Sequence, residues 1–173
     1  YNRIWNGGET PEHALADQVV DTVTRDGIFA TVDVHNSSGK NPHYACINRL
    51  ENPYVNLGRR FSRTLVYFTR PAEVLSCRFA PYGPSISIES GLPGEPQGVQ
   101  HVAQFLEECL RGESIPGEAI ENPDCDLYHS TVCIRVPRRS TVGFENNGSN
   151  LDFCFIENLD LINFSELPEN ALL

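Results

Sequence analysis

Two polar residues, His35 and Glu89, each end an apolar run that has the pattern of a β-strand. His35 closes residues 28–35, and Glu89 closes residues 85–89, where serine and isoleucine alternate. A loop with polar residues or glycine follows each of them. In open α/β sheets, ligands bind outside the carboxyl ends of the strands. The pair could therefore serve as a metal ligand and a general base, or be a hydrogen-bonded histidine and a solvated glutamate.

Helix-like segments alternate with these strand-like runs. Residues 10–27 open with Thr10-Pro11-Glu12, which is typical of a helix start, and carry an apolar stripe. Residues 97–111 carry a second stripe that stops at Gly112. Residues 64–68 form a short continuous apolar run, as in a strand covered on both faces. The alternation predicts an α/β fold.

The sequence pattern changes near Glu113. Residues 114–173 show no helical period and contain four short β-like runs, at 127–136, 141–144, 151–156 and 159–164, separated by turns rich in glycine and asparagine. We therefore predict an α/β domain over residues 1–113 and a small C-terminal antiparallel β domain, a barrel or sandwich, over residues 114–173.

The amino-acid composition limits the kinds of molecule that the protein is expected to bind. The 173 residues include 13 Lys+Arg and 23 Asp+Glu, which gives a formal net charge of −10. This balance argues against a nucleic-acid partner, because phosphate contacts need clustered cations. An anionic ligand would need a local cluster of arginines. A membrane is also not expected as a partner, since no apolar run approaches the roughly 18 residues of a membrane span.

The cysteines are scattered and form no C-x-x-C pair, which argues against a structural zinc module. A chain of this length and aliphatic content does not need disulfides for stability. We predict reduced, buried thiols and a cytoplasmic protein. The six residues are Cys46, Cys77, Cys109, Cys125, Cys133 and Cys154.

Four short segments occur in a specific order. Residues 1–5 (Y-N-R-I-W) are similar to a D-L-N-R-x-F segment, and residues 32–36 (V-D-V-H-N) to a D-L-H-N strand end. Residues 87–91 and 96–99 (S-I-E-S-G and P-Q-G-V) are similar to E-x-G followed by P-Q-G-V, and Arg78 lies eleven residues before Glu89. In this order they resemble the zinc carboxypeptidase-like superfamily, in its aspartoacylase and succinylglutamate desuccinylase branch. The likeness covers about residues 1–111.

The resemblance implies a mixed, mostly parallel sheet flanked by helices, and a zinc-dependent metallohydrolase. The substrate would be a small amide or peptide with a carboxylate next to the cleaved bond, so the protein would be an N-acyl amino acid deacylase or a carboxypeptidase. His35 would bind zinc, and Glu89 would be the general base. Asn2 and Arg3 would bind the substrate carboxylate, and Arg78 a second carboxylate or the developing oxyanion. The protein could assemble as a homo-oligomer.

One element of the superfamily pattern is absent from the chain. The first two zinc ligands come from an H-x-x-E motif upstream of the N-R segment, and none of the five histidines has glutamate three positions later. We expect these two ligands upstream of Tyr1. His43 and Cys46 are weaker candidates for substitute ligands. The alternative function is a non-catalytic module that binds anions or carboxylates on the same fold.

Overall fold

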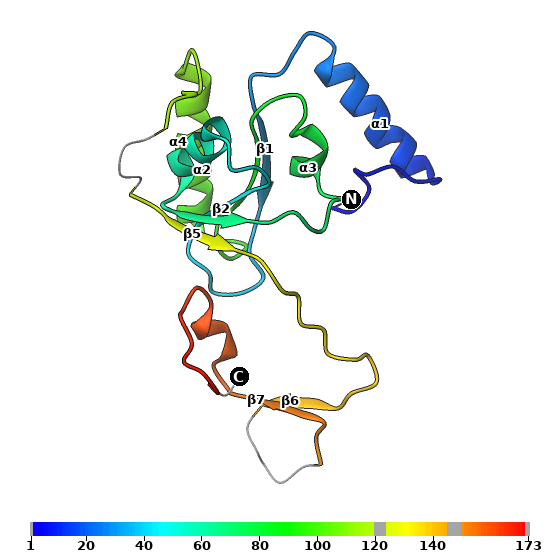
Figure 1. Ribbon diagram of the computed structural model, residues 1–173, viewed down its shortest axis with the longest axis vertical. Coiled ribbons are helices and arrows are strands. Elements are labelled where there is room, and N and C mark those ends of the chain that lie inside the picture. Colours follow the sequence, from blue (N-terminus) through cyan, green and yellow to red (C-terminus); the bar gives the residue numbers. More distant parts are fainter. Residues whose placement is uncertain (1, 120–123, 145–149, 172–173) are drawn as a thin grey trace.

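A computed structural model describes residues 2–119, 124–144 and 150–171 (Figure 1). Tyr1, the first residue of the predicted N-R segment, lies outside the described residues. In chain order the elements are α1 (Pro11–Thr24), β1 (Thr31–His35), β2 (Tyr44–Ile47), α2 (Asn52–Phe61), β3 (Thr64–Tyr67), α3 (Leu75–Phe79), β4 (Ser85–Glu89), α4 (Pro96–Arg111), β5 (Asp126–His129), β6 (Val142–Phe144), β7 (Phe153–Phe155) and the 3₁₀ helix η1 (Leu159–Ile162).

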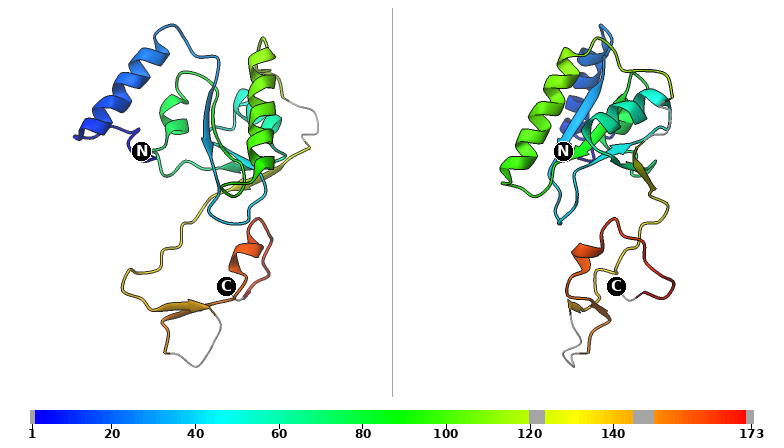
Figure 2. Two further views of the ribbon diagram at one scale, coloured as in Figure 1. Left: turned by 180° about the vertical axis from the view of Figure 1, so that it is seen from behind. Right: turned by 90° about the vertical axis from the view of Figure 1, so that its left-hand side faces the viewer.

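The main sheet has five strands in the order β1-β4-β2-β3-β5. The β2–β4 pair is antiparallel, and the other three pairs are parallel. Helices cover both faces, with α2 and α4 on one side and α1 and α3 on the other (Figures 1 and 2). The predicted fold class, a mixed and mostly parallel sheet flanked by helices, is confirmed.

The hydrophobic core lies between the sheet and the α2/α4 layer. Side chains that alternate along β2 and β4 point into it because successive residues of a strand face opposite sides. Burying each large aliphatic or aromatic side chain contributes about 1.5–3 kcal/mol to folding. The cluster consists of Ala45, Ile47, Leu57, Phe61, Leu65, Ile86, Ile88 and Phe105.

The opposite face of β4 carries serines. Ser85 and Ser87 are buried there, and the Ser87 hydroxyl donates to Ser76 Oγ of α3 at 3.1 Å. This hydrogen bond seats the short α3 against the centre of the sheet. Beyond α3, toward the ends of β1 and β4, the same face carries the polar residues described in the next subsection.

The C-terminal region differs from the predicted antiparallel domain. β5, which was expected in the second domain, pairs with β3 and so extends the main sheet past residue 113. β6 and β7 pair in parallel, and residues 159–162 form a 3₁₀ helix in place of a strand. The reason is a lack of apolar cover: the flanking residues 130–139 are exposed, so three-residue strands have no core on which to close a barrel. The division at residue 113 stays a prediction.

Within the described residues, no helix combines the length and apolar character needed to cross a membrane.

Candidate functional site

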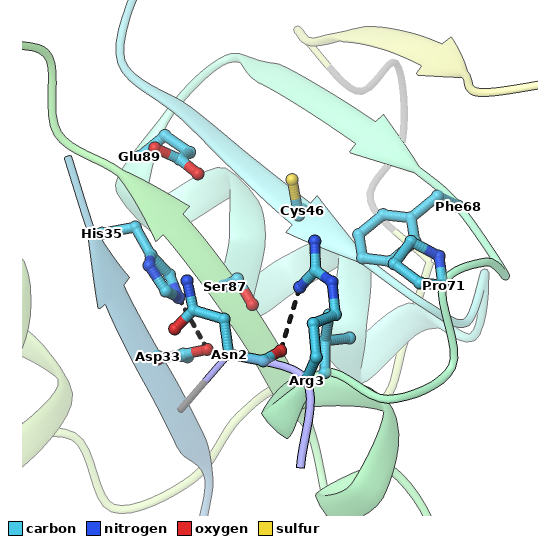
Figure 3. A pocket seen from close by; sticks show the side chains of 10 residues that line it. Asn2, Arg3, Asp33, His35, Cys46, Phe68, Pro71, Ser87 and Glu89 are labelled. Atoms are coloured by element: carbon cyan, nitrogen blue, oxygen red, sulfur yellow. Dashed lines mark hydrogen bonds and ion pairs between the residues drawn. The ribbon is translucent and has the colours of Figure 1, made fainter. Parts of the chain in front are cut away.

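His35 and Glu89 lie side by side at the ends of two adjacent strands. They are direct partners in the parallel register of β1 and β4. Both side chains line one cavity of about 210 Å³ on the α1/α3 side of the sheet (Figure 3). The structure therefore brings together the two residues that the strand pattern selected. The cavity is also lined by Asn2, Arg3, Asp33, Cys46, Phe68, Pro71, Val74 and Ser87.

An imidazole–carboxylate pair forms one wall of this cavity. His35 Nε2 lies 2.8 Å from Asp33 Oδ2, and about a quarter of each side chain is exposed. This contact holds the imidazole against a carboxylate, as in metal sites where such a partner orients a ligand histidine. The other ring nitrogen, Nδ1, can act as a metal ligand when it carries no proton.

Glu89 is held in a half-buried position with a single hydroxyl partner. Ser37 Oγ donates to its Oε2 at 3.3 Å. Burial raises the pKa of Glu89, and this effect outweighs the neighbouring His35 and Ser37, which lower it. A carboxylate whose pKa is moved toward neutrality is suited to accept a proton and return it.

Arg3 brings a cation to the same cavity. Its guanidinium donates to the backbone oxygen of Asn2 at 2.9 Å (Figure 3). The following Trp5 anchors this N-terminal segment, because its backbone N–H donates to Glu73 O at 3.2 Å and its ring packs on Phe79. Arg3 is thereby kept over the cavity, where its remaining N–H groups can grip a carboxylate.

The structure places Arg78 in an ion pair between two helices. Its Nη2 lies 2.9 Å from Asp17 Oδ1 of α1, and its Nε is buried without a partner among the described residues. This contact joins α3 to α1. Its substrate-binding role stays a prediction.

His43 and Cys46, the substitute ligands considered from the sequence, point to opposite faces of the sheet. His43 stacks with Phe61 and His101 in the α2/α4 layer. Cys46 lines the cavity, where burial and Glu89 raise its pKa to about 12, so the thiol stays neutral. The two cannot share a metal ion.

Sequence reasoning missed two residues of the site, Ser37 and Ser87. Ser37 comes from the loop after β1, and no pattern indicates that its hydroxyl returns to Glu89. Cys46 was considered only as a weaker candidate for a substitute ligand, and it lies on β2, a strand that was not predicted. Ser87 could have been found, because it lies two residues before Glu89 and so shares its face.

These residues fit only part of a zinc site. His35 with Asp33 behind it has the chemistry of one zinc ligand and its orienting carboxylate. A catalytic zinc normally has three protein ligands. The described residues contain no group of three or more His, Cys, Asp or Glu side chains that could hold a metal. They do not complete a zinc site by themselves.

Comparisons with known proteins bear on the fold. No protein-family model matches the chain, and neither does any curated protein. Among solved structures, the succinylglutamate desuccinylase from Chromobacterium violaceum is similar, with a TM-score of 0.61 and 14% identity over 77% of this chain and 52% of that chain. The chain has the desuccinylase fold.

A second desuccinylase structure, from Vibrio parahaemolyticus, has a TM-score of 0.50 and 19% identity over 84% of this chain and 47% of that one. The chain thus spans about half the length of each structure. Both neighbours belong to the branch that the four sequence segments resemble, so the resemblance is confirmed at the level of the fold.

Proposed function

We propose that the protein is an N-acyl amino acid deacylase, a zinc-dependent hydrolase that cleaves an amide next to a carboxylate. The observation that carries this proposal is the convergence in one cavity of an oriented imidazole, a carboxylate of raised pKa and a guanidinium. The desuccinylase fold of the chain supports deacylation over peptide cleavage.

Zinc would be held by Nδ1 of His35 together with ligands beyond the described residues. When bound, it supplies Lewis acidity and makes hydroxide available near neutral pH.

Arg3 and Asn2 would bind the substrate carboxylate and so fix the amide carbonyl over Glu89. The Glu89 carboxylate accepts a proton from the attacking water as the oxygen–carbon bond forms. It then delivers that proton to the amide nitrogen as the carbon–nitrogen bond breaks. The products are a free carboxylic acid and an amine, and Glu89 returns to its ionised form.

The test is amide hydrolysis by the full-length gene product with added zinc. The panel contains N-succinylglutamate, N-acetyl amino acids, their carboxamide counterparts and C-terminal dipeptides. We expect cleavage of N-acyl amino acids and little cleavage once the carboxylate is an amide. Glu89→Gln should lower kcat by about 10²–10⁴-fold. Glu108→Gln, an exposed change on α4, is the matched control. Full activity of Glu89→Gln would refute the mechanism.

The same panel separates the alternatives. Preferred cleavage of C-terminal dipeptides would indicate a carboxypeptidase. A non-catalytic carboxylate-binding module would bind the acids, with loss of binding in Arg3→Gln, and would cleave none of the amides.

A further inference from the structure

A second, larger cavity adjoins the candidate site. Its volume is about 710 Å³, against about 210 Å³ for the first, and the two share Arg3 and Pro71 as lining residues. Ligand pockets usually enclose about 300–1,000 Å³, so only the second cavity has room for more than a small reacting group. It is lined by Arg3, Arg70, Pro71, Ala72, Glu73, Cys133 and Arg135.

Three arginines from distant parts of the chain face this cavity. Arg3 precedes α1, Arg70 follows β3, and Arg135 belongs to the extended segment after β5. Within the described ranges, none of the three has a carboxylate within 4 Å.

The feature that sets these three arginines apart is that they share one cavity. Of the nine other arginines in the sequence, Arg63, Arg78 and Arg111 pair with an acidic side chain, and among the described residues the remaining six do not. Three arginines that line one cavity without carboxylate partners create a local positive field that attracts anions.

Glu73 also lines this cavity, so the three arginines and one glutamate give its wall a net charge of +2. An ionised carboxylate can accept a hydrogen bond from a ligand but cannot donate one. A ligand that fits this wall has several carboxylates and also N–H donors. A peptide meets both requirements, whereas a polyphosphate has no N–H group to donate to Glu73.

We propose that this second cavity binds a short acidic peptide, which forms the amine half of the substrate. Arg3 takes the carboxylate nearest the cleaved amide, and Arg70 and Arg135 take carboxylates of the following residues. This inference rests on the proposed deacylase function, because that function places the cleaved amide beside Arg3. The substrate is then an N-acylated acidic peptide, larger than a single amino acid.

The test is direct binding of triglutamate, the expected type of product, to the full-length protein by isothermal titration calorimetry at low salt. Triglutamine and inorganic triphosphate are the comparison ligands. We expect triglutamate to bind most tightly. Arg70→Gln and Arg135→Gln should each weaken it about 5-fold, as for exposed ion pairs, and together about 20-fold. Arg139→Gln, an exposed change of equal charge near Arg135, should leave binding unchanged.

Equal binding of triglutamate by wild type and the double variant would overturn the proposal, as would equal losses in Arg139→Gln. Triphosphate binding as tight as that of triglutamate would overturn the assignment to a peptide. The hydrolysis assay is separate. If triglutamate binds as expected and no amide is cleaved, the binding site stands and the deacylase function fails. If N-acyl amino acids are cleaved while the double variant binds triglutamate normally, the function stands and the peptide site fails.

Discussion

In its ionised form, which is the form that accepts a proton, Glu89 lowers the stability of the folded protein. Burial raises its pKa in the folded state above the ordinary 4.5. The folded protein therefore binds the proton more tightly than the unfolded chain, and stability falls as the pH rises from about 4.5 through the raised pKa. Below pH 4.5 the group is protonated in both states and the cost is absent.

Because ionised Glu89 lowers stability, we predict that Glu89→Gln stabilises the metal-free protein at pH 7. Near pH 4, where Glu89 is protonated, variant and wild type should have more similar stability. Thermal unfolding across this pH range, with a chelator present, measures the difference. Glu108→Gln on the exposed face of α4 should show no such trend. A difference for Glu89→Gln that is the same at pH 4 and pH 7 would contradict the prediction.

Asp33 is predicted to act through His35. Replacing Asp33 by Asn removes the charge beside the imidazole and so weakens the contact that orients the His35 ring. Loss of such an orienting partner lowers metal affinity or activity by about 10–100-fold. Zinc titration and kcat/KM measure the effect, and Asp21→Asn on the exposed side of α1 is the control. Unchanged zinc affinity together with unchanged kcat/KM would show that Asp33 has no positioning role.

At the scale of elements, the sequence predicted the parts whose signals are local. α1 and α4 have proline near their first position and carry apolar side chains at helical spacing, and β1, β3 and β4 coincide with apolar or alternating runs. β2 and α3 were missed because they have four and five residues. Four residues span only two strand periods and five residues little more than one helical turn, so neither pattern repeats often enough to be recognised.

The sequence likewise predicted only some residues of the candidate site. The strand pattern selected His35 and Glu89, and their alternation places Asp33 and Ser87 on the same face. The resemblance alone pointed to Arg3. The sheet order, which sets β2 between β4 and β3, depends on long-range pairing. No local signal shows that Cys46 would enter the cavity.

The start of α4 packs on Ser90, the residue that follows β4. A Cβ at Gly98 would lie 2.1 Å from the Ser90 backbone oxygen. Ser90 in turn donates to His35 O at 2.9 Å, from both its N–H and its hydroxyl. Helix, loop and strand are thus joined by consecutive tight contacts.

Gly98→Ala should therefore disturb both stability and activity. Overpacking of this kind costs about 1–3 kcal/mol in the free energy of unfolding. We expect a lower midpoint in chemical denaturation and a lower kcat. Gly117→Ala is the matched control, because a Cβ there meets nothing within 4 Å. Equal stability of the two variants would show that α4 can shift without cost.

At the scale of the whole molecule, the C-terminal segment meets the α/β body at an aromatic contact. The Phe164 ring lies 4.9 Å from that of Tyr44 and 5.2 Å from that of Tyr128. Tyr128 also donates its hydroxyl hydrogen to Phe164 O at 3.2 Å, and Asn163 donates to Asn41 at 2.7 Å. The sequence could not predict this contact, because it joins residues 36 or more positions apart.

That the protein assembles as a homo-oligomer stays a prediction.

We predict that Phe164 holds the C-terminal segment against the α/β body. Phe164→Ala removes two aromatic pairs, each contributing about 0.5–1.5 kcal/mol. The core cluster lies in the α2/α4 layer on the other side of β2, so the body should keep its unfolding temperature while residues 130–144 and 150–162 become more open to protease. Limited proteolysis with mass spectrometry, and thermal unfolding of the same sample, measure the two effects. Leu167→Ala, an exposed change in the same segment, should leave cleavage as in wild type. If protease cleaves Phe164→Ala no faster than wild type, other contacts hold the segment. If the unfolding temperature of the body falls together with faster cleavage, segment and body unfold as one unit.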